Sequence, residues 1–110
     1  MKTAKAFVAT LLFTIFTNCV AGGTGPTSNI KHILYYEGHV GVLIITEAAL
    51  INPDACERGG QYYILRNSHP LYKEMTALLL SAQMSGQPLA LSVNGCVQGL
   101  PSVVNISSTK

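Results

Sequence analysis

The spacing of hydrophobic residues divides this chain into strands and one helix. Over residues 30–36 and 89–94, apolar and polar residues alternate with a period close to two, which indicates β-strands. β-Branched residues and tyrosines are common in these stretches, as is typical of strands. The predicted strands cover residues 30–36, 39–46, 61–65, 89–94 and 102–106.

One helix is predicted between the third and fourth strands. Ser68 is the expected N-cap, and Gly86 followed by Pro88 marks the expected end. Leu80 lies off the apolar stripe of this helix, where it is either an incidental surface residue or part of a subunit contact. The stripe itself has helical spacing over about four turns and consists of Leu71, Met75, Leu78, Leu79 and Ala82.

The order of elements is therefore β-β-β-α-β-β, which predicts a mainly β fold with one helix. Five strands with a helix between the third and the fourth are the order of the OB-fold, a five-stranded barrel. An open α+β sheet with the helix on one face is the alternative. The predicted domain covers residues 30–107, with a flexible Gly/Pro/Ser/Thr-rich arm at 22–29 and a polar tail at 108–110.

The first 21 residues have the organisation of an export signal. Lys2 and Lys5 precede an apolar run over residues 6–16, and Ala21 is a small residue immediately before Gly22. The run is shorter than the roughly 20 residues that a membrane-spanning helix needs. We therefore expect cleavage after Ala21 and a protein in the periplasm or outside the cell, with no membrane span in the mature chain.

Removal of this segment changes the charge of the protein. The chain has seven Lys and Arg against five Asp and Glu, and the segment contains Lys2 and Lys5, so the mature chain has five cations and five anions. A protein that binds nucleic acid usually needs clustered cations to neutralise phosphates. The composition therefore argues against a nucleic-acid partner.

Two cysteines remain after residue 21. Because export leads to an oxidising compartment, Cys56 and Cys96 are predicted to form a disulfide. Two free buried thiols are the first alternative, and a zinc site is a weaker one because no histidine has ligand spacing from either cysteine. Cys19 could also be a lipoprotein cysteine, although the residues before it fit that pattern poorly.

The candidates for catalysis are few. His32, His39 and His69 are the histidines, and each is more simply explained as a structural or solvated residue. Asp54 and Glu57 flank Cys56 and could form an acid–base pair, although Asp54 after Asn-Pro more often bonds its own turn. We predict that the protein is not an enzyme and needs no metal or cofactor.

The tyrosines are more suggestive. They occur as the adjacent pairs Tyr35–Tyr36 and Tyr62–Tyr63, and neighbouring strand residues point to opposite faces. One ring of each pair is therefore predicted in the core and the other on the surface, unless tyrosines merely fill strand positions. Exposed tyrosines suit sugar or protein ligands, and Arg66 and Asn94 could add polar contacts. The predicted ligand-binding residues are thus Tyr35, Tyr36, Tyr62, Tyr63, Arg66 and Asn94.

Several segments resemble a family of small exported bacterial proteins without an assigned activity. The resemblance covers almost the whole mature chain, so it implies the type of protein and no particular function. The segments are Ile51–Cys56, Tyr62–Leu65, His69–Pro70, Leu78–Ala82, Gly95–Cys96 and Leu100–Pro101.

A second resemblance covers about a quarter of the chain. The helix from Leu71 to Gly86, followed by residues 87–91, is similar to the helix–glycine–strand passage of the binding subunits of AB-type toxins. Those subunits are exported, disulfide-bonded OB-fold chains that form pentameric rings and bind host glycans. The resemblance implies a ring oligomer and a glycan partner, but none of that family's sugar-binding residues can be matched here.

Taken together, the sequence predicts an exported, non-catalytic binding module. Its ligand would be a glycan or a protein surface, and a toxin-like ring is the sharper form of this hypothesis. A stand-alone periplasmic or surface protein, such as an accessory factor or an inhibitor, is the alternative.

Overall fold

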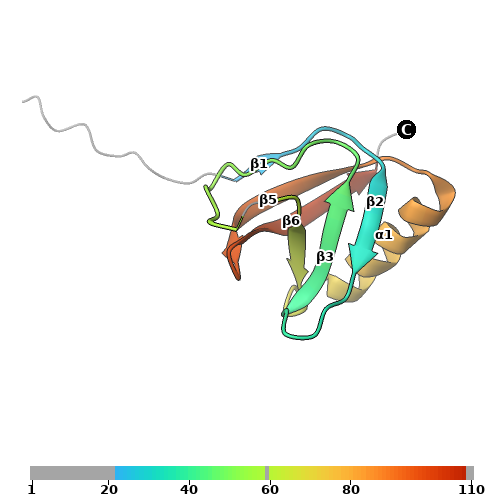
Figure 1. Cartoon of the computed structure of the whole chain (residues 1–110). Coiled ribbons are helices and arrows are strands. Elements are labelled where there is room, and N and C mark those ends of the chain that lie inside the picture. Colours follow the sequence, from blue (N-terminus) through green and yellow to red (C-terminus); the bar gives the residue numbers. More distant parts are fainter. Residues whose placement is uncertain (1–21, 59, 109–110) are drawn as a thin grey trace, which may run out of the picture.

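In a computed structural model, the described residues are 22–58 and 60–108, and they form a mainly β structure with one helix (Figure 1). The predicted signal peptide, residues 1–21, lies outside the described residues, and so do Cys19 and the last two residues of the predicted tail. The prediction of a mainly β protein with a single helix is confirmed for the part of the chain that is described.

Each of the five predicted strands is present, and a short sixth strand precedes them. β5 and β6 extend further than predicted, because the turn between them is only residues 98–99. The elements are β1 (Gly23–Thr24), β2 (Ile30–Leu34), β3 (Gly41–Thr46), β4 (Tyr63–Arg66), α1 (Tyr72–Ser85), β5 (Leu89–Val97) and β6 (Leu100–Ser108).

The strands form one six-stranded open sheet with the order β1-β5-β6-β4-β3-β2. Neighbouring strands are antiparallel except β4 and β6, which are parallel and pair at Ile64 and Ser102. The prediction of a closed barrel of five strands is therefore wrong, and the open sheet fits the alternative. The discrepancy in strand number arises from the segment before β2, which was expected to be an arm.

That segment, residues 22–29, is hydrogen-bonded to the sheet. The Gly25 N–H donates to the Leu91 carbonyl at 2.9 Å, and Ser28 and Leu89 exchange two backbone bonds of 2.9 and 2.8 Å. β1 and β2, the two ends of the strand order, are thus contributed by neighbouring stretches of chain. Backbone pairing of this kind uses no side chains, so the Gly- and Pro-rich composition did not reveal it.

β3 and β4 approach each other closely at Gly41. Gly41 pairs with Arg66, and a Cβ atom at position 41 would overlap the Leu65 carbonyl. Glycine is therefore required here by the space between two backbones.

The helix ends as predicted and begins differently. Gly86 has the left-handed conformation with φ 76° and donates its N–H to the Ala82 carbonyl, as expected of a C-terminal glycine. At the other end, Leu71 is the N-cap position and no side chain caps it, so the prediction of Ser68 as N-cap is wrong. Leu71 is also 53% exposed and does not belong to the buried stripe.

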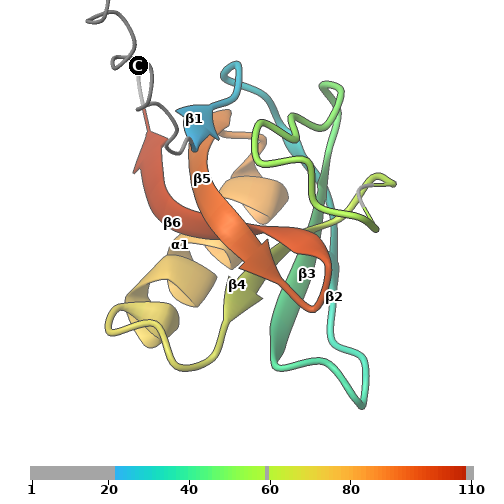
Figure 2. The ribbon, with the colours of Figure 1, turned by 90° about the vertical axis from the view of Figure 1, so that its left-hand side faces the viewer.

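The core has two parts, one on each side of the sheet. The larger part lies between the sheet and α1, which covers one side of the curved sheet (Figure 2). Met75, Leu79 and Ala82 are the buried residues of α1. The smaller part comprises Leu43, Ile64 and Leu100, against which partly buried residues from other elements pack: Leu34, Tyr62 and Val97.

The predicted disulfide is confirmed. Cys56 and Cys96 are bonded, at a sequence separation of 40. The bond joins the irregular segment between β3 and β4 to the end of β5, two regions that otherwise share few regular backbone contacts. A cross-link over a loop of this length contributes about 4 kcal/mol in the chain-entropy description.

We expect the double substitution Cys56→Ala and Cys96→Ala to lower the free energy of unfolding by about 4 kcal/mol, because the unfolded chain regains the entropy that the cross-link removes. Urea unfolding of the mature chain, followed by circular dichroism, measures the change. The far-ultraviolet spectrum should stay the same, since the sheet and helix do not depend on the sulfur atoms. An unchanged unfolding midpoint would show that the bond adds nothing to stability.

Candidate functional site

The most exposed aromatic residues lie in the connection between β2 and β3. We call residues 35–40 the aromatic turn. Tyr35 and Tyr36 are 59% and 50% exposed, so the prediction that one ring of this pair is in the core is wrong. The reason is that β2 ends at Leu34, and the alternation of faces does not continue into the turn.

A hollow of about 270 Å³ lies beside the aromatic turn, and we call it the tyrosine hollow. A second hollow of about 350 Å³ adjoins it at the start of α1 and shares Asn67 and Tyr72 with it. The residues from the aromatic turn therefore meet residues from the β4–α1 connection at this site. The tyrosine hollow is lined by Tyr35, Tyr36, Glu37, His39, Gly41, Asn67 and Tyr72.

The aromatic turn has its own internal contacts. The His39 N–H donates to the Tyr36 carbonyl at 3.2 Å, and the two rings are 6.1 Å apart between centroids. The His39 Nδ1 atom is buried and has no hydrogen-bond partner among the described residues. Because an unpaired buried polar atom is unfavourable, the turn would gain stability from a rearrangement that supplies a partner.

A glutamine from the opposite hairpin fixes the aromatic turn. Gln98, in the β5–β6 turn, accepts the Val40 N–H through Oε1 at 2.8 Å and donates from Nε2 to the Gly38 carbonyl at 3.0 Å. Gln98 has a φ of 52°, an unfavourable value for a residue with a side chain. The backbone strain and the paired bonds together indicate that the glutamine is specifically positioned to hold this turn.

His69 fixes the other side of the site. Its Nδ1 accepts the Leu71 N–H and its Nε2 donates to the Val104 carbonyl, both at 3.0 Å. The carbonyl can only accept and the N–H can only donate, so these partners assign the proton to Nε2. His69 therefore has a structural role, as one of the two expectations for the histidines held, and it ties the start of α1 to β6.

The phenol of Tyr35 has a perturbed acidity. Partial burial, and secondarily repulsion from Tyr72, raise the pKa of Tyr35 above its usual value of 10.0. Both effects disfavour the phenolate. Tyr35 is thus a neutral donor and acceptor over the physiological range of pH, and it lies close enough to Tyr72 for the two phenols to influence each other.

The other predicted binding residues lie elsewhere. Tyr63 is buried in the larger core, where its hydroxyl accepts the Ile51 N–H at 3.0 Å, and Tyr62 packs half-buried on the smaller core. The second tyrosine pair thus divides between a buried and a more exposed ring as predicted. Arg66 ends β4 and Asn94 lies on β5 next to Gly22, and neither lines the tyrosine hollow.

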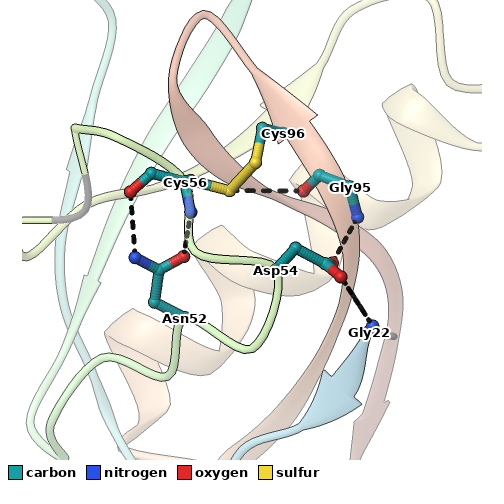
Figure 3. The surroundings of a disulfide bond; sticks show 6 residues. All are labelled: Gly22, Asn52, Asp54, Cys56, Gly95 and Cys96. Carbon is teal, nitrogen blue, oxygen red and sulfur yellow. Dashed lines mark hydrogen bonds between the residues drawn. A yellow bond between two sulfur atoms is a disulfide. The ribbon is translucent and has the colours of Figure 1, made fainter. Parts of the chain in front are cut away.

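The candidate acid–base residues have structural surroundings. His32 is exposed on β2, and Glu57 is exposed in the segment before β4. Asp54 accepts backbone N–H groups from Gly22 and Gly95, so the expectation that it bonds its own turn is wrong (Figure 3). Over residues 22–58 and 60–108, no three or more His, Cys, Asp or Glu side chains cluster as metal ligands would.

A larger hollow of about 600 Å³ lies next to the disulfide. It is bounded on one side by Gln98, so it borders the residue that holds the aromatic turn. Ala55 also lines it and, like Gln98, has a positive φ, here 53°. The lining residues are Ala55, Cys56, Glu57, Arg58, Cys96, Gln98 and Gly99.

Five residues of the site were not singled out from the sequence. Glu37, Gly41, Asn67 and Tyr72 line the tyrosine hollow, and Gln98 holds the aromatic turn. Tyr72 could have been found because it begins the predicted helix beside a predicted turn. Asn67 and Gln98 act through contacts between segments far apart in sequence, for which a single sequence contains no pattern.

The described helix is not long and apolar enough to span a membrane.

We expect Tyr72→Phe to shift the pKa of Tyr35 part of the way back towards 10.0, because repulsion from a second phenolate is lost while burial remains. In the folded protein Tyr35 ionises later than in the unfolded chain. Its contribution to stability is therefore complete below pH 10 and declines as the pH rises further. Near-ultraviolet titration of phenolate, with Tyr35→Phe subtracted to isolate this group, measures the shift. Tyr62→Phe is the control and should leave the Tyr35 curve unchanged; an equal shift there would refute the contact.

No protein-family model, no curated protein and no solved structure matches this chain. The two resemblances drawn from the sequence therefore stay predictions. The functional argument rests on the residues of the tyrosine hollow and on the contacts that position them.

Proposed function

We propose that this chain is an exported, non-catalytic binding module and that it binds a glycan in the tyrosine hollow. The observation on which this proposal depends is the exposure of Tyr35 and Tyr36 beside Tyr72, in a hollow that also has polar side chains. Two tyrosine rings left half or more exposed make a small contribution to the core, which favours a role in recognition.

The chemistry of the hollow suits a sugar. A pyranose ring has one or two faces of C–H groups, which pack on an aromatic ring, and a rim of hydroxyls, which need hydrogen-bond partners. Tyr36 offers an exposed ring for the first contact. Asn67 and Glu37 offer amide and carboxylate groups for the second, and the neutral phenol of Tyr35 can both donate and accept.

The position of the hollow in the fold supports the same proposal. We infer that the fold is OB-like in its strand order: β4 pairs in parallel with β6, and α1 lies between β4 and β5. OB-fold proteins bind oligosaccharides and oligonucleotides through the first hairpin loop and the last one. The corresponding connections here are the aromatic turn and the β5–β6 turn, which Gln98 joins by two hydrogen bonds.

Export is the other part of this proposal. The disulfide between Cys56 and Cys96 is compatible with an oxidising compartment. The amino-terminal pattern of two lysines, an apolar run and a small residue at 21 favours the same location. A secreted or periplasmic binding module would meet glycans of a cell surface or envelope directly.

We expect the mature chain to bind at least one glycan on an array of host and bacterial glycans, and Tyr36→Ala to weaken that binding at least tenfold. A tenfold loss corresponds to about 1.4 kcal/mol, a modest value for one aromatic contact. Titration calorimetry with the best glycan measures the change. Gln98→Ala should also weaken binding, because the aromatic turn loses the two bonds that hold it.

Met84→Ala is the matched control for this experiment. Met84 is 85% exposed at the other end of α1, about 18 Å along the helix from Tyr72, so its loss should not affect the hollow. An array with no bound glycan, or a Tyr36→Ala variant with full affinity, would exclude glycan binding at this site. The stand-alone accessory or inhibitor role would then be the better hypothesis.

A ring of identical subunits is a second candidate, and one observation favours it. Leu80 and Met84 are 40% and 85% exposed, and they are one helical turn apart on α1. An apolar pair on the outer side of a helix is unfavourable in water and can be covered by a second copy of the chain. The sequence allowed two explanations for Leu80, and a subunit contact was one of them.

We expect a ring to give five times the subunit mass in light scattering at micromolar concentration, and the double substitution Leu80→Ser and Met84→Ser to reduce it to the monomer. Ala49→Ser, at an exposed position in the segment between β3 and β4, is the control for a general effect of added hydroxyls. A monomer for the unsubstituted protein would end the ring hypothesis and leave glycan binding untouched.

A further inference from the structure

The backbone nitrogen of Gly22 lies against a carboxylate. Its distances to Oδ1 and Oδ2 of Asp54 are 3.1 and 3.3 Å, so both oxygens face this one nitrogen (Figure 3). Gly22 and Asp54 are each half-buried. The two residues are 32 positions apart in sequence, so the contact is made by the fold and not by a local turn.

The carboxylate is held in place independently of Gly22. Asp54 Oδ2 also accepts the Gly95 N–H at 2.7 Å, which links it to β5. The segment around Asp54 is closed by Asn52, whose amide group bonds both the N–H of Cys56 at 2.8 Å and its carbonyl at 3.0 Å. The disulfide then ties the same segment to β5. Three separate constraints therefore position Asp54, and none of them involves the amino-terminal segment.

Position 22 accepts only glycine. Its φ is 62°, a conformation that residues with side chains rarely adopt, and a Cβ atom there would lie 2.6 Å from the Val93 carbonyl oxygen. Such a separation is shorter than any real carbon–oxygen contact of this kind. The residue at this position must therefore lie close to β5 without a side chain, while its nitrogen points at Asp54.

The same residue follows the predicted cleavage site. The export signal ends at Ala21, so its removal would make Gly22 the first residue of the mature chain. The amino-terminal pattern and the contact with Asp54 are independent observations, since one comes from residues 1–21 and the other from the folded domain. They identify the same nitrogen atom.

We propose that Asp54 is the binding site for the mature amino terminus, and that cleavage of the Ala21–Gly22 bond creates an ion pair between the new α-ammonium group of Gly22 and this carboxylate. Signal peptidase hydrolyses the amide bond with one water molecule, which leaves a carboxylate on Ala21 and an amine on Gly22. The amine takes up a proton at neutral pH. This inference depends on the export part of the proposed function and is independent of glycan binding.

Cleavage changes the strength of the contact through charge and through the number of donors. Before cleavage, Gly22 has a single amide N–H to share between two oxygens. The amide N–H already makes a charge-assisted bond to the carboxylate. After cleavage the nitrogen has three N–H donors, and its positive charge adds the attraction between opposite charges. β1 begins at the next residue and pairs with β5, so the ion pair secures the end of the sheet.

The test compares three forms of the amino terminus on the folded, oxidised protein. They are the mature chain from Gly22, the same chain acetylated at Gly22, and a chain that retains Val20 and Ala21. We expect the mature chain to melt about 3–6 °C above the other two, a shift typical of somewhat under 1 kcal/mol in a domain of this size. Acetylation is the sharper comparison because it restores a single amide N–H without charge, as in the uncleaved chain, and adds only an acetyl group.

Asp54→Asn in all three forms provides the matched control. This substitution keeps an oxygen for the Gly95 N–H and removes the negative charge, so it should abolish the difference between the three forms. Equal melting temperatures of the three unsubstituted forms would overturn the proposal. A difference that persists in Asp54→Asn would also overturn it, because the gain would then come from another group.

Mass spectrometry of the exported protein tests the position of cleavage. An amino terminus at Gly22 is expected, and any other terminus would overturn the assignment of this nitrogen to the ion pair. Gly22→Ala should still be cleaved but should melt lower than the parent, since its Cβ meets the Val93 carbonyl. Failure of export altogether would contradict the proposed function as well, whereas a stable glycan-binding protein without the melting difference would contradict only this inference.

Discussion

The bond between Cys56 and Cys96 is the constraint on which most other features depend. It holds the irregular segment between β3 and β4 against the end of β5, where backbone pairing alone provides little attachment. Asp54 lies two residues from one sulfur-bearing residue, and Gln98 lies two residues from the other. The side chain that bonds Gly22 and the side chain that bonds the aromatic turn thus each lie two residues from the same cross-link.

The sequence predicted those elements that bury side chains in a regular pattern. The stretches with a period near two became strands, and the change to helical spacing identified α1 and its terminal glycine. The start of the helix was predicted wrongly because His69 bonds the Leu71 N–H with its ring, a geometry that resembles no common capping pattern. β1 was missed because it pairs through the backbone of Gly23 and Thr24. Such pairing leaves no periodic pattern of hydrophobic residues in the sequence.

The candidate site could be predicted only in part, for a related physical reason. Tyr35 and Tyr36 were found because they are adjacent tyrosines at the end of a predicted strand. Their role as a pair was misjudged, since the strand that would have alternated their faces ends one residue earlier. Gln98, which fixes the aromatic turn, bonds residues 58 and 60 positions away, and such contacts exist only after the two hairpins have met.

The pairing of β1 with β5 has a consequence for how the protein is made. Thr24 and Ser92, whose hydroxyls lie 2.8 Å apart, are separated by 68 positions. Synthesis proceeds from the amino end, so the first strand is complete long before its partner exists. Its N–H and C=O groups therefore stay unpaired until nearly the whole polypeptide has been synthesised, and closing so long a loop is slow. Loss of the last hairpin would therefore leave the opening segment of the chain permanently without a neighbour, and exposed to association with other unfinished molecules.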